Sequence, residues 1–430
     1  MLEIGALLGA DRVRRPLERE TGIAQTIVEP ASLDEISELV RKCESDGFTL
    51  APLGSGATLT ELRRRPVDLG ISLKRLSRVI AYEPEDMTIV ATAGLTLGEV
   101  NRLCGERRQR LGIDPPNPAS HTLGAVIGAA HSGPLRLSEG LVRDLLIGIQ
   151  FIGNAGRVVR AGGRVVKNVA GYDLMKLMTG SFGTLGIVTE ATFKIRPMPE
   201  RYAIATASFP TIESAFGAAA RVHDALPLTH MEVLSPGYAK LVGYQPNYLM
   251  LAGFSGNRDE LSYQRDKIAG LLDIACDILE ETGAQELYRR LRDLSSTNRS
   301  LVAQISVLPA KLAQCVASVQ RFTMEALHGT GGGSNDYGID FCAHAGVGVA
   351  QISVEHLMSA ERASQLVQRW RAAAREASGH VRVTSIAPIS RGEISLFDSP
   401  AEGAMKLMRR LKASFDPAGI FNPGCFVGGI

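Results

Sequence analysis

Three glycine-rich segments in the first 190 residues have the composition of a site for a phosphate and a planar ring. The first, residues 52–58, reads Pro-Leu-Gly-Ser-Gly-Ala-Thr and follows a predicted strand. Two glycines flank Ser55, so consecutive backbone N–H groups can point into one concavity, and the hydroxyls of Ser55 and Thr58 add donors. A pyrophosphate requires this chemistry. A tight turn would explain the same glycines.

The second segment, residues 121–134, combines a helix start with small side chains. Thr122 can cap a helix whose first turn carries only small residues, so a planar ligand or a phosphate can approach the helix amides. The alternative is close packing of two helices through Gly124 and Gly128.

The third segment, residues 171–190, joins a short helix to a strand. The helix breaks at Gly180, and Gly183 and Gly186 allow a close backbone approach ahead of an alternating strand at 187–195. Exposed amide and carbonyl groups on such a strand can pair with the edge of an adenine.

Other motifs exclude several common chemistries. The chain has no GKS or GKT of a P-loop, no GxGxxG after an early strand, and no HExxH. Residues 179–183 lack the first glycine of a nucleophile elbow, which argues against a serine hydrolase. The six cysteines are scattered and form no CxxC pair, so we expect no metal site and no iron–sulfur cluster in this chain. Any electrons that it handles must leave through another molecule.

The charge balance and the hydropathy limit the partners. Lys and Arg number 47 against 45 Asp and Glu, a net charge of +2, which argues against a nucleic-acid partner. No stretch approaches the ~18 consecutive apolar residues of a membrane span. The opening residues carry Glu3 where a signal peptide would be basic. We therefore expect a cytoplasmic protein.

Both helices and strands are predicted to position these segments. Up to Pro197 the patterns predict a helix from Leu33 to about Asp46, a hairpin at 145–160 and the strand at 187–195. After Pro199, strands and helices alternate as in an antiparallel sheet with helices on one face, which predicts an α+β fold. The expected strands are 203–208, 231–235, 247–254, 300–307 and 339–353, and the expected helices are 211–225, 258–282, 309–327, 358–377 and 401–415.

In this order the three segments resemble the FAD domain of the vanillyl-alcohol-oxidase-like, or PCMH-type, flavoproteins. The most specific part is GSFGTLGIVTEATFKIRP at 180–197, and FDPAGIFNPG at 415–424 is a second anchor. GRVVKNVAGYD at 163–173 is similar to the flavin-binding E-type subunit of bacterial glycolate oxidase. The resemblance implies a two-lobed FAD-binding domain at 20–198 and a cap domain at 199–390 with an antiparallel sheet covered by helices. A C-terminal segment at 391–430 would pack back toward the FAD domain.

The resemblance also implies which residues bind FAD. It assigns the pyrophosphate to Gly54, Ser55, Gly56, Ala57 and Thr58, the flavin and ribityl chain to Thr122, Leu123, Gly124, Ala125, Ser132 and Gly133, and the adenosine half to Gly183, Ile187 and Val188. Several related enzymes bond FAD covalently through a His or Cys in the first loop. Ser55 and Ala57 cannot do this, so we expect non-covalent FAD, with Cys104 left open as a second attachment point.

One segment departs from the catalytic members of this superfamily. They carry an HxGDGNxH-like sequence whose histidines bind a metal and act on the substrate, whereas residues 344–351 read HAGVGVAQ. Val347 and Val349 replace the aspartate and the asparagine, and Gln351 replaces the second histidine. His344 alone cannot supply both a base and a metal ligand. The catalytic residues therefore stay unassigned, and we expect slow turnover by the chain alone.

Three functions remain open. The first is the FAD-binding subunit of a glycolate-type 2-hydroxy acid dehydrogenase, with a second flavoprotein subunit and an iron–sulfur subunit as partners and contact with the inner membrane only through them. The second is a stand-alone FAD-dependent dehydrogenase that uses Tyr172, Lys167 or His344 as its base. The third is a non-catalytic scaffold stabilised by FAD.

Overall fold

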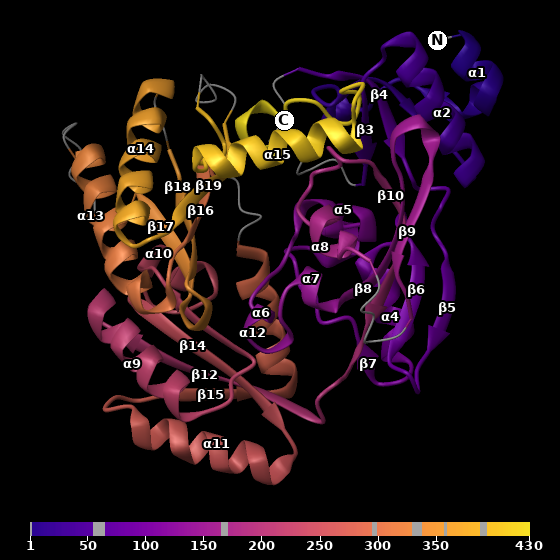
Figure 1. The fold of residues 1–430 in the computed structure, drawn as a ribbon. Coiled ribbons are helices and arrows are strands. Elements are labelled where there is room, and N and C mark those ends of the chain that lie inside the picture. Colours follow the sequence, from indigo (N-terminus) through magenta and orange to yellow (C-terminus); the bar gives the residue numbers. More distant parts are fainter. Residues whose placement is uncertain are drawn as a thin grey trace. The chain divides into compact units, whose positions relative to one another are not determined.

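The chain forms two compact units in the computed structural model, which describes residues 2–54, 65–164, 171–294, 299–328, 338–356, 359–387 and 394–430. The first unit comprises Met1–Ser132, Gly140–Met198 and Ser399–Ile430. The second comprises Gly133–Glu139 and Pro199–Asp398. Figure 1 shows the elements of both. No helix within the described ranges combines the length and the apolar character needed to cross a membrane.

The first unit contains two main sheets. In one, β2 (Ala24–Val28), β4 (Val67–Ser72) and β3 (Leu50–Leu53) run parallel, and β1 (Val13–Arg14) pairs antiparallel with β2. The other is antiparallel, in the order β5-β6-β10-β8-β9. Its strands are β5 (Val79–Glu83), β6 (Thr88–Thr92), β10 (Ile187–Lys194), β8 (Leu146–Ile152) and β9 (Val158–Gly162). The short strands β7 (Gln109–Arg110) and β11 (Arg196–Pro197) form a separate pair.

Helices and local caps complete the first unit. The expected helix is α2 (Leu33–Asp46), which begins after the Ser32 cap and ends at Gly47, in the left-handed region. The expected hairpin is β8 and β9, joined through a turn at 154–156. The other helices are α1 (Leu2–Leu8), α4 (Leu97–Gly105), α5 (Leu123–Ala129), α7 (Val142–Leu145), α8 (Leu174–Met178) and α15 (Glu402–Phe415).

The second unit is built on an eight-stranded antiparallel sheet of order β15-β12-β14-β13-β17-β18-β16-β19. The strands are β12 (Arg201–Phe209), β13 (His230–Leu234), β14 (Tyr248–Gly256), β15 (Asp277–Glu280), β16 (Leu301–Ser306), β17 (Ile339–His344), β18 (Val349–Val354) and β19 (His380–Ile386). The main apolar core lies between one face of this sheet and the helices α9 (Ile212–Ala225), α11 (Arg258–Leu271), α13 (Leu312–His328) and α14 (Ala360–Glu376). A smaller core on the other face involves α10 (Pro236–Leu241) and α12 (Glu281–Asp293). The short helix α6 (Arg136–Glu139) also belongs to this unit.

The predicted helix at 258–282 is wrong over its second half. Helix α11 ends at Leu271, and residues 277–280 form the edge strand β15, which pairs with β12. The backbone groups of Ile278 and Leu279 are satisfied in the sheet instead of in a helix. The strands expected at 339–353 are confirmed as the hairpin of β17 and β18, in which η7 (Ala345–Val347) and Gly348, with φ of 72°, turn the chain.

Candidate functional site

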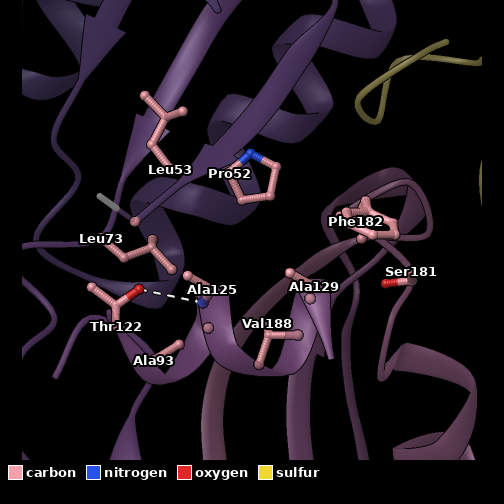
Figure 2. A pocket seen from close by; sticks show the side chains of 15 residues that line it. Pro52, Leu53, Leu73, Ala93, Thr122, Ala125, Ala129, Ser181, Phe182 and Val188 are labelled. Carbon is pink, nitrogen blue, oxygen red and sulfur yellow. Dashed lines mark hydrogen bonds between the residues drawn. The ribbon is translucent and has the colours of Figure 1, made fainter. Parts of the chain in front are cut away.

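An open cavity in the first unit lies where the three glycine-rich segments meet (Figure 2). Its volume is about 680 Å³, counting the space at its mouth. The walls come from the end of β3, the ends of β4 and β6, helix α5, the loop before β10 and the start of β10. The lining residues are Pro52, Leu53, Gly54, Leu73, Ala93, Thr122, Gly124, Ala125, Gly128, Ala129, Ser181, Phe182, Gly183, Gly186 and Val188.

Glycines let these walls approach one another. A Cβ atom on Gly54 would lie 2.6 Å from Thr122 Oγ1 and 2.8 Å from Ala125 Cβ. A Cβ atom on Gly183 would overlap the ring of Pro52, and its φ of 69° also disfavours a side chain. The cavity walls are therefore mostly backbone and small side chains, which suits a long, partly planar ligand.

The loop at 180–186 has an unusual backbone that α5 holds in place. Positive φ angles occur at Gly180 (79°), Phe182 (52°), Gly183 (69°) and Gly186 (149°). Gly180 N donates to Ile127 O at 2.9 Å, and Phe182 N donates to Gly128 O at 2.8 Å. Phe182 is a bulky residue in the left-handed region, so its surroundings must fix this conformation.

The C-terminal segment supplies part of that fixation. The amide of Asn422 donates to Phe182 O at 2.5 Å, and Asn422 is fully buried. Lys412 Nζ, on α15, donates to Thr184 O at 2.8 Å and to Phe421 O at 2.9 Å. The chain end is therefore joined by hydrogen bonds to the loop that lines the cavity.

We expect Asn422→Ala to lower the free energy of unfolding by about 1–3 kcal/mol, because it leaves the Phe182 carbonyl without this donor. Alanine also tolerates the φ of 42° at this position less well than asparagine does. Flavin affinity should fall as well. Urea unfolding and flavin titration measure the two effects, with Asn101→Ala as control, since Asn101 accepts from Leu111 N at 2.8 Å in another part of the first unit. Equal flavin affinities in the two variants would contradict a role for Asn422 in the cavity.

One polar group of the cavity is free to bind a ligand, but the backbone amides that were expected to do so are not. The Ser181 hydroxyl oxygen is buried and has no hydrogen-bond partner among the described residues, so it can bind a polar ligand atom. The expectation that the first amides of α5 are open to a ligand is wrong. Leu123 N donates to Leu95 O and Gly124 N to Ala93 O, both at 2.9 Å, and Ala125 N donates to Thr122 Oγ1 at 3.3 Å (Figure 2).

The predicted FAD-binding residues fall into three groups. Six line the cavity, namely Gly54, Thr122, Gly124, Ala125, Gly183 and Val188. Four do not: Leu123 and Ile187 are fully buried in the core, and Ser132 and Gly133 lie beyond the end of α5. Ser55, Gly56, Ala57 and Thr58 lie outside the described residues. The sequence did not reveal Pro52, Leu73, Ala93 or Ser181, which reach the cavity through the packing of distant segments.

The pairing of β10 with its two neighbouring strands leaves few of its backbone groups for the predicted contact with adenine. β10 pairs with β8 from Ile187 onward, but its ladder with β6 begins only at Glu190. Only the first residues of β10 are therefore outside that second ladder, and Val188 there lines the cavity.

Covalent attachment through Cys104 has no structural support. Cys104 is fully buried in α4, and burial raises the pKa of its thiol to about 11. The described lining residues include no His, Cys or Tyr. The described residues that line the cavity therefore fit FAD.

The second unit contains a buried polar cluster that sequence reasoning missed. His230 and Glu232 lie two residues apart on β13, so their side chains share one face of the sheet. Glu232 is directly opposite His344 of β17, and its carboxylate bonds to both histidines through their Nδ1 atoms. Tyr202 Oη lies 2.7 Å from His230 Nε2. A His-x-Glu sequence in a predicted strand was the only available signal.

The other candidate bases are less favourable. The Tyr172 side chain is 90% exposed, and Lys167 lies outside the described residues. Within the described ranges, no three His, Cys, Asp or Glu side chains are arranged to hold a metal ion.

The comparisons with known proteins agree on a flavin site. Residues 24–162 match the FAD binding domain family, and residues 395–425 match the C-terminal domain of FAD-linked oxidases. An uncharacterized FAD-linked oxidoreductase of Mycobacterium tuberculosis is 26% identical over 93% of this chain and 90% of its own length. A D-lactate dehydrogenase of Anaerostipes hadrus is 25% identical over 93% of this chain and 89% of its own.

Sequence similarity to glycolate oxidase is confined to part of the chain. Similarity to a solved structure extends over nearly all of it. Glycolate oxidase subunit GlcE of Escherichia coli is 38% identical over 122 residues, 28% of this chain and 35% of that protein. The solved structure of p-cresol methylhydroxylase with substrate bound superposes with a TM-score of 0.70 at 15% identity, covering 98% of this chain and 95% of the other. This likeness shows the PCMH-type α+β fold, with FAD-binding lobes and a second unit on a large antiparallel sheet. Two segments of the chain thus match domain families of FAD-linked oxidases, and the chain has the PCMH-type flavoenzyme fold.

Proposed function

We propose that this chain is the FAD-bearing subunit of a complex that oxidises small 2-hydroxy acids and passes the electrons to an iron–sulfur partner. The observation that carries the proposal is the cavity at which all three glycine-rich segments meet. The D-lactate dehydrogenase and glycolate oxidase relatives support a CH–OH donor. The absence of any CxxC pair supports a separate electron carrier.

In this proposal the residues at 20–198 form the FAD-binding domain, 199–390 the cap domain, and 391–430 the segment that returns to the FAD domain. Gly54 and the loop Ser55–Thr58 would hold the pyrophosphate, and Thr122 and Ala125 would lie along the flavin and ribityl chain. Gly183 and Val188 would lie along the adenosine half. When bound, FAD supplies an acceptor for a hydride equivalent from the alcohol carbon. The complex would be cytoplasmic and would reach the inner membrane only through its partners.

We expect the purified protein to be yellow and to release intact FAD when it is denatured. The reason is that neither the described cavity wall nor the loop sequence at 55–64 offers a His, Cys or Tyr for a covalent bond. Acid precipitation followed by chromatography of the supernatant measures the release. Flavin that stays with the precipitated chain would show a covalent link.

A second candidate, a stand-alone FAD-dependent 2-hydroxy acid dehydrogenase, is favoured by the contact of His344 with the Glu232 carboxylate. Anaerobic addition of glycolate or D-lactate separates the candidates. Loss of the flavin absorbance band only in preparations that contain the partners supports the complex, and loss in the chain alone supports the stand-alone enzyme. No loss in either preparation would leave the scaffold function.

A further inference from the structure

The buried cluster in the second unit forms one continuous hydrogen-bonded chain, from Tyr202 through His230 and Glu232 to His344. Tyr202 Oη is 2.7 Å from His230 Nε2, and His230 Nδ1 makes a very short contact with Glu232 Oε2. The other carboxylate oxygen, Glu232 Oε1, is 3.1 Å from His344 Nδ1. Four side chains from β12, β13 and β17 are thereby joined.

Sheet register and a single glycine build this chain. Glu232 and His344 are directly opposite on β13 and β17, so their side chains are neighbours on one face. His230 is directly opposite Gly253 of β14, and a Cβ atom on Gly253 would overlap the imidazole ring of His230. Gly253 therefore provides the space in which the ring reaches Glu232.

The partners fix where the protons lie. A carboxylate only accepts hydrogen bonds, so both imidazoles must donate to Glu232 from Nδ1–H. His230 Nε2 is then an acceptor, and the Tyr202 hydroxyl donates to it. The remaining ring nitrogen, His344 Nε2, has no hydrogen-bond partner in the described part of the chain and keeps a free lone pair.

The two histidines keep Glu232 ionised. Burial favours the neutral acid, but the electrostatic attraction and the hydrogen bonds of His230 and His344 outweigh it and lower the pKa of Glu232. The side chains of His230 and Glu232 are 0% exposed, whereas His344 is 13% exposed. His230 and Glu232 are thus sealed from water, and the partly exposed members lie at the two ends of the cluster, Tyr202 and His344.

We propose that Glu232, supported by His230 and Tyr202, is a positioning residue that fixes His344 as a proton acceptor through Nε2. Oxidation of an alcohol to a carbonyl releases a proton from the hydroxyl and a hydride equivalent from the carbon. In our proposal the O–H bond breaks and the proton bonds to His344 Nε2. The hydride equivalent goes to FAD, the oxidant in the proposed function. The chemical role of His344 rests on that function, but its tautomer does not.

The first experiment reads the tautomer without any substrate. In the full chain with ¹⁵N-labelled histidine, two-bond ¹H–¹⁵N correlation should show His344 with a protonated Nδ1 and a bare Nε2, and the His344→Gln spectrum assigns the signal. The amide introduced by Glu232→Gln has only one acceptor oxygen, so one of the two histidines should switch to the Nε2–H form. A wild-type His344 that carries its proton on Nε2 would overturn the proposal.

The second experiment measures anaerobic flavin reduction by D-lactate and glycolate. We expect His344→Gln and Glu232→Gln to slow reduction by a factor of about 10²–10⁴, the usual contribution of a positioned base. Tyr202→Phe, which removes only the far donor, should keep the His344 tautomer and lower the rate by less than about tenfold. His380→Gln, the same change at an exposed histidine of β19, is the matched control and should keep the wild-type rate.

A negative result in one experiment does not decide the outcome of the other. Wild-type rates in a folded Glu232→Gln variant would overturn the positioning role, with circular dichroism and the urea midpoint confirming the fold. If no 2-hydroxy acid reduces the wild-type flavin, either in the chain alone or in preparations that contain the partners, the proposed function is wrong, and the tautomer measurement still decides whether Glu232 positions His344.

Discussion

Gly183→Val should abolish FAD binding. At this position φ is 69°, a conformation that a β-branched residue adopts only with strain. Any side chain would also overlap the Pro52 ring, which forms part of the cavity wall. The wall would have to move at the point where the first and third glycine-rich segments meet, so we expect no bound flavin in the purified variant.

A matched pair of alanine variants separates the effect of the overlap with Pro52 from the effect of backbone strain. Gly180 has a similar φ of 79°, but a Cβ atom there would meet only Ala130 Cβ at 3.5 Å, an ordinary contact. Gly180→Ala should therefore lose roughly 1–2 kcal/mol of stability from backbone strain alone, whereas Gly183→Ala should lose more because of the overlap with Pro52 and should also lose flavin affinity. Flavin absorbance per chain and urea unfolding provide both values. Wild-type flavin content in folded Gly183→Val would contradict the site.

Local sequence signals predicted most elements correctly. Helix α2 spans the predicted range from Leu33 to Asp46, and α5 begins after the predicted Thr122 cap. The failure at 271–280 had a distant cause, because the chain there joins the sheet edge along β12, about seventy residues earlier in the sequence. A helical pattern in the sequence does not reveal such a pairing.

The site was predictable where it depended on glycine and unpredictable where it depended on packing. Gly54 and Gly183 line the cavity at points where a Cβ atom would overlap a neighbouring wall, and Gly124 packs closely against Ala93. The amides of α5 were misjudged because the segment that follows β6 supplies acceptors, Ala93 O and Leu95 O, that the sequence does not show. Glu232 was missed because it meets His344 across 112 positions of sequence, through strand register alone.

We expect the isolated chain to oxidise 2-hydroxy acids slowly. The second unit offers a proton acceptor in His344, but the described residues contain no group able to hold a divalent metal that would bind the substrate carboxylate. In residues 344–351, Val347 and Val349 offer no ligand. Flavin reduction should therefore fall well below ordinary enzyme rates, which are on the order of 1–10³ per second.

Anaerobic stopped-flow reduction of the bound flavin by D-lactate or glycolate tests this account most directly. We expect the flavin band of the isolated chain to disappear at less than about 1 per second, and the complex with its iron–sulfur partner to reach ordinary rates. Reduction of the isolated chain at ordinary enzyme rates would contradict the need for partners and establish the stand-alone dehydrogenase. Failure of both preparations to react would contradict oxidation of 2-hydroxy acids altogether.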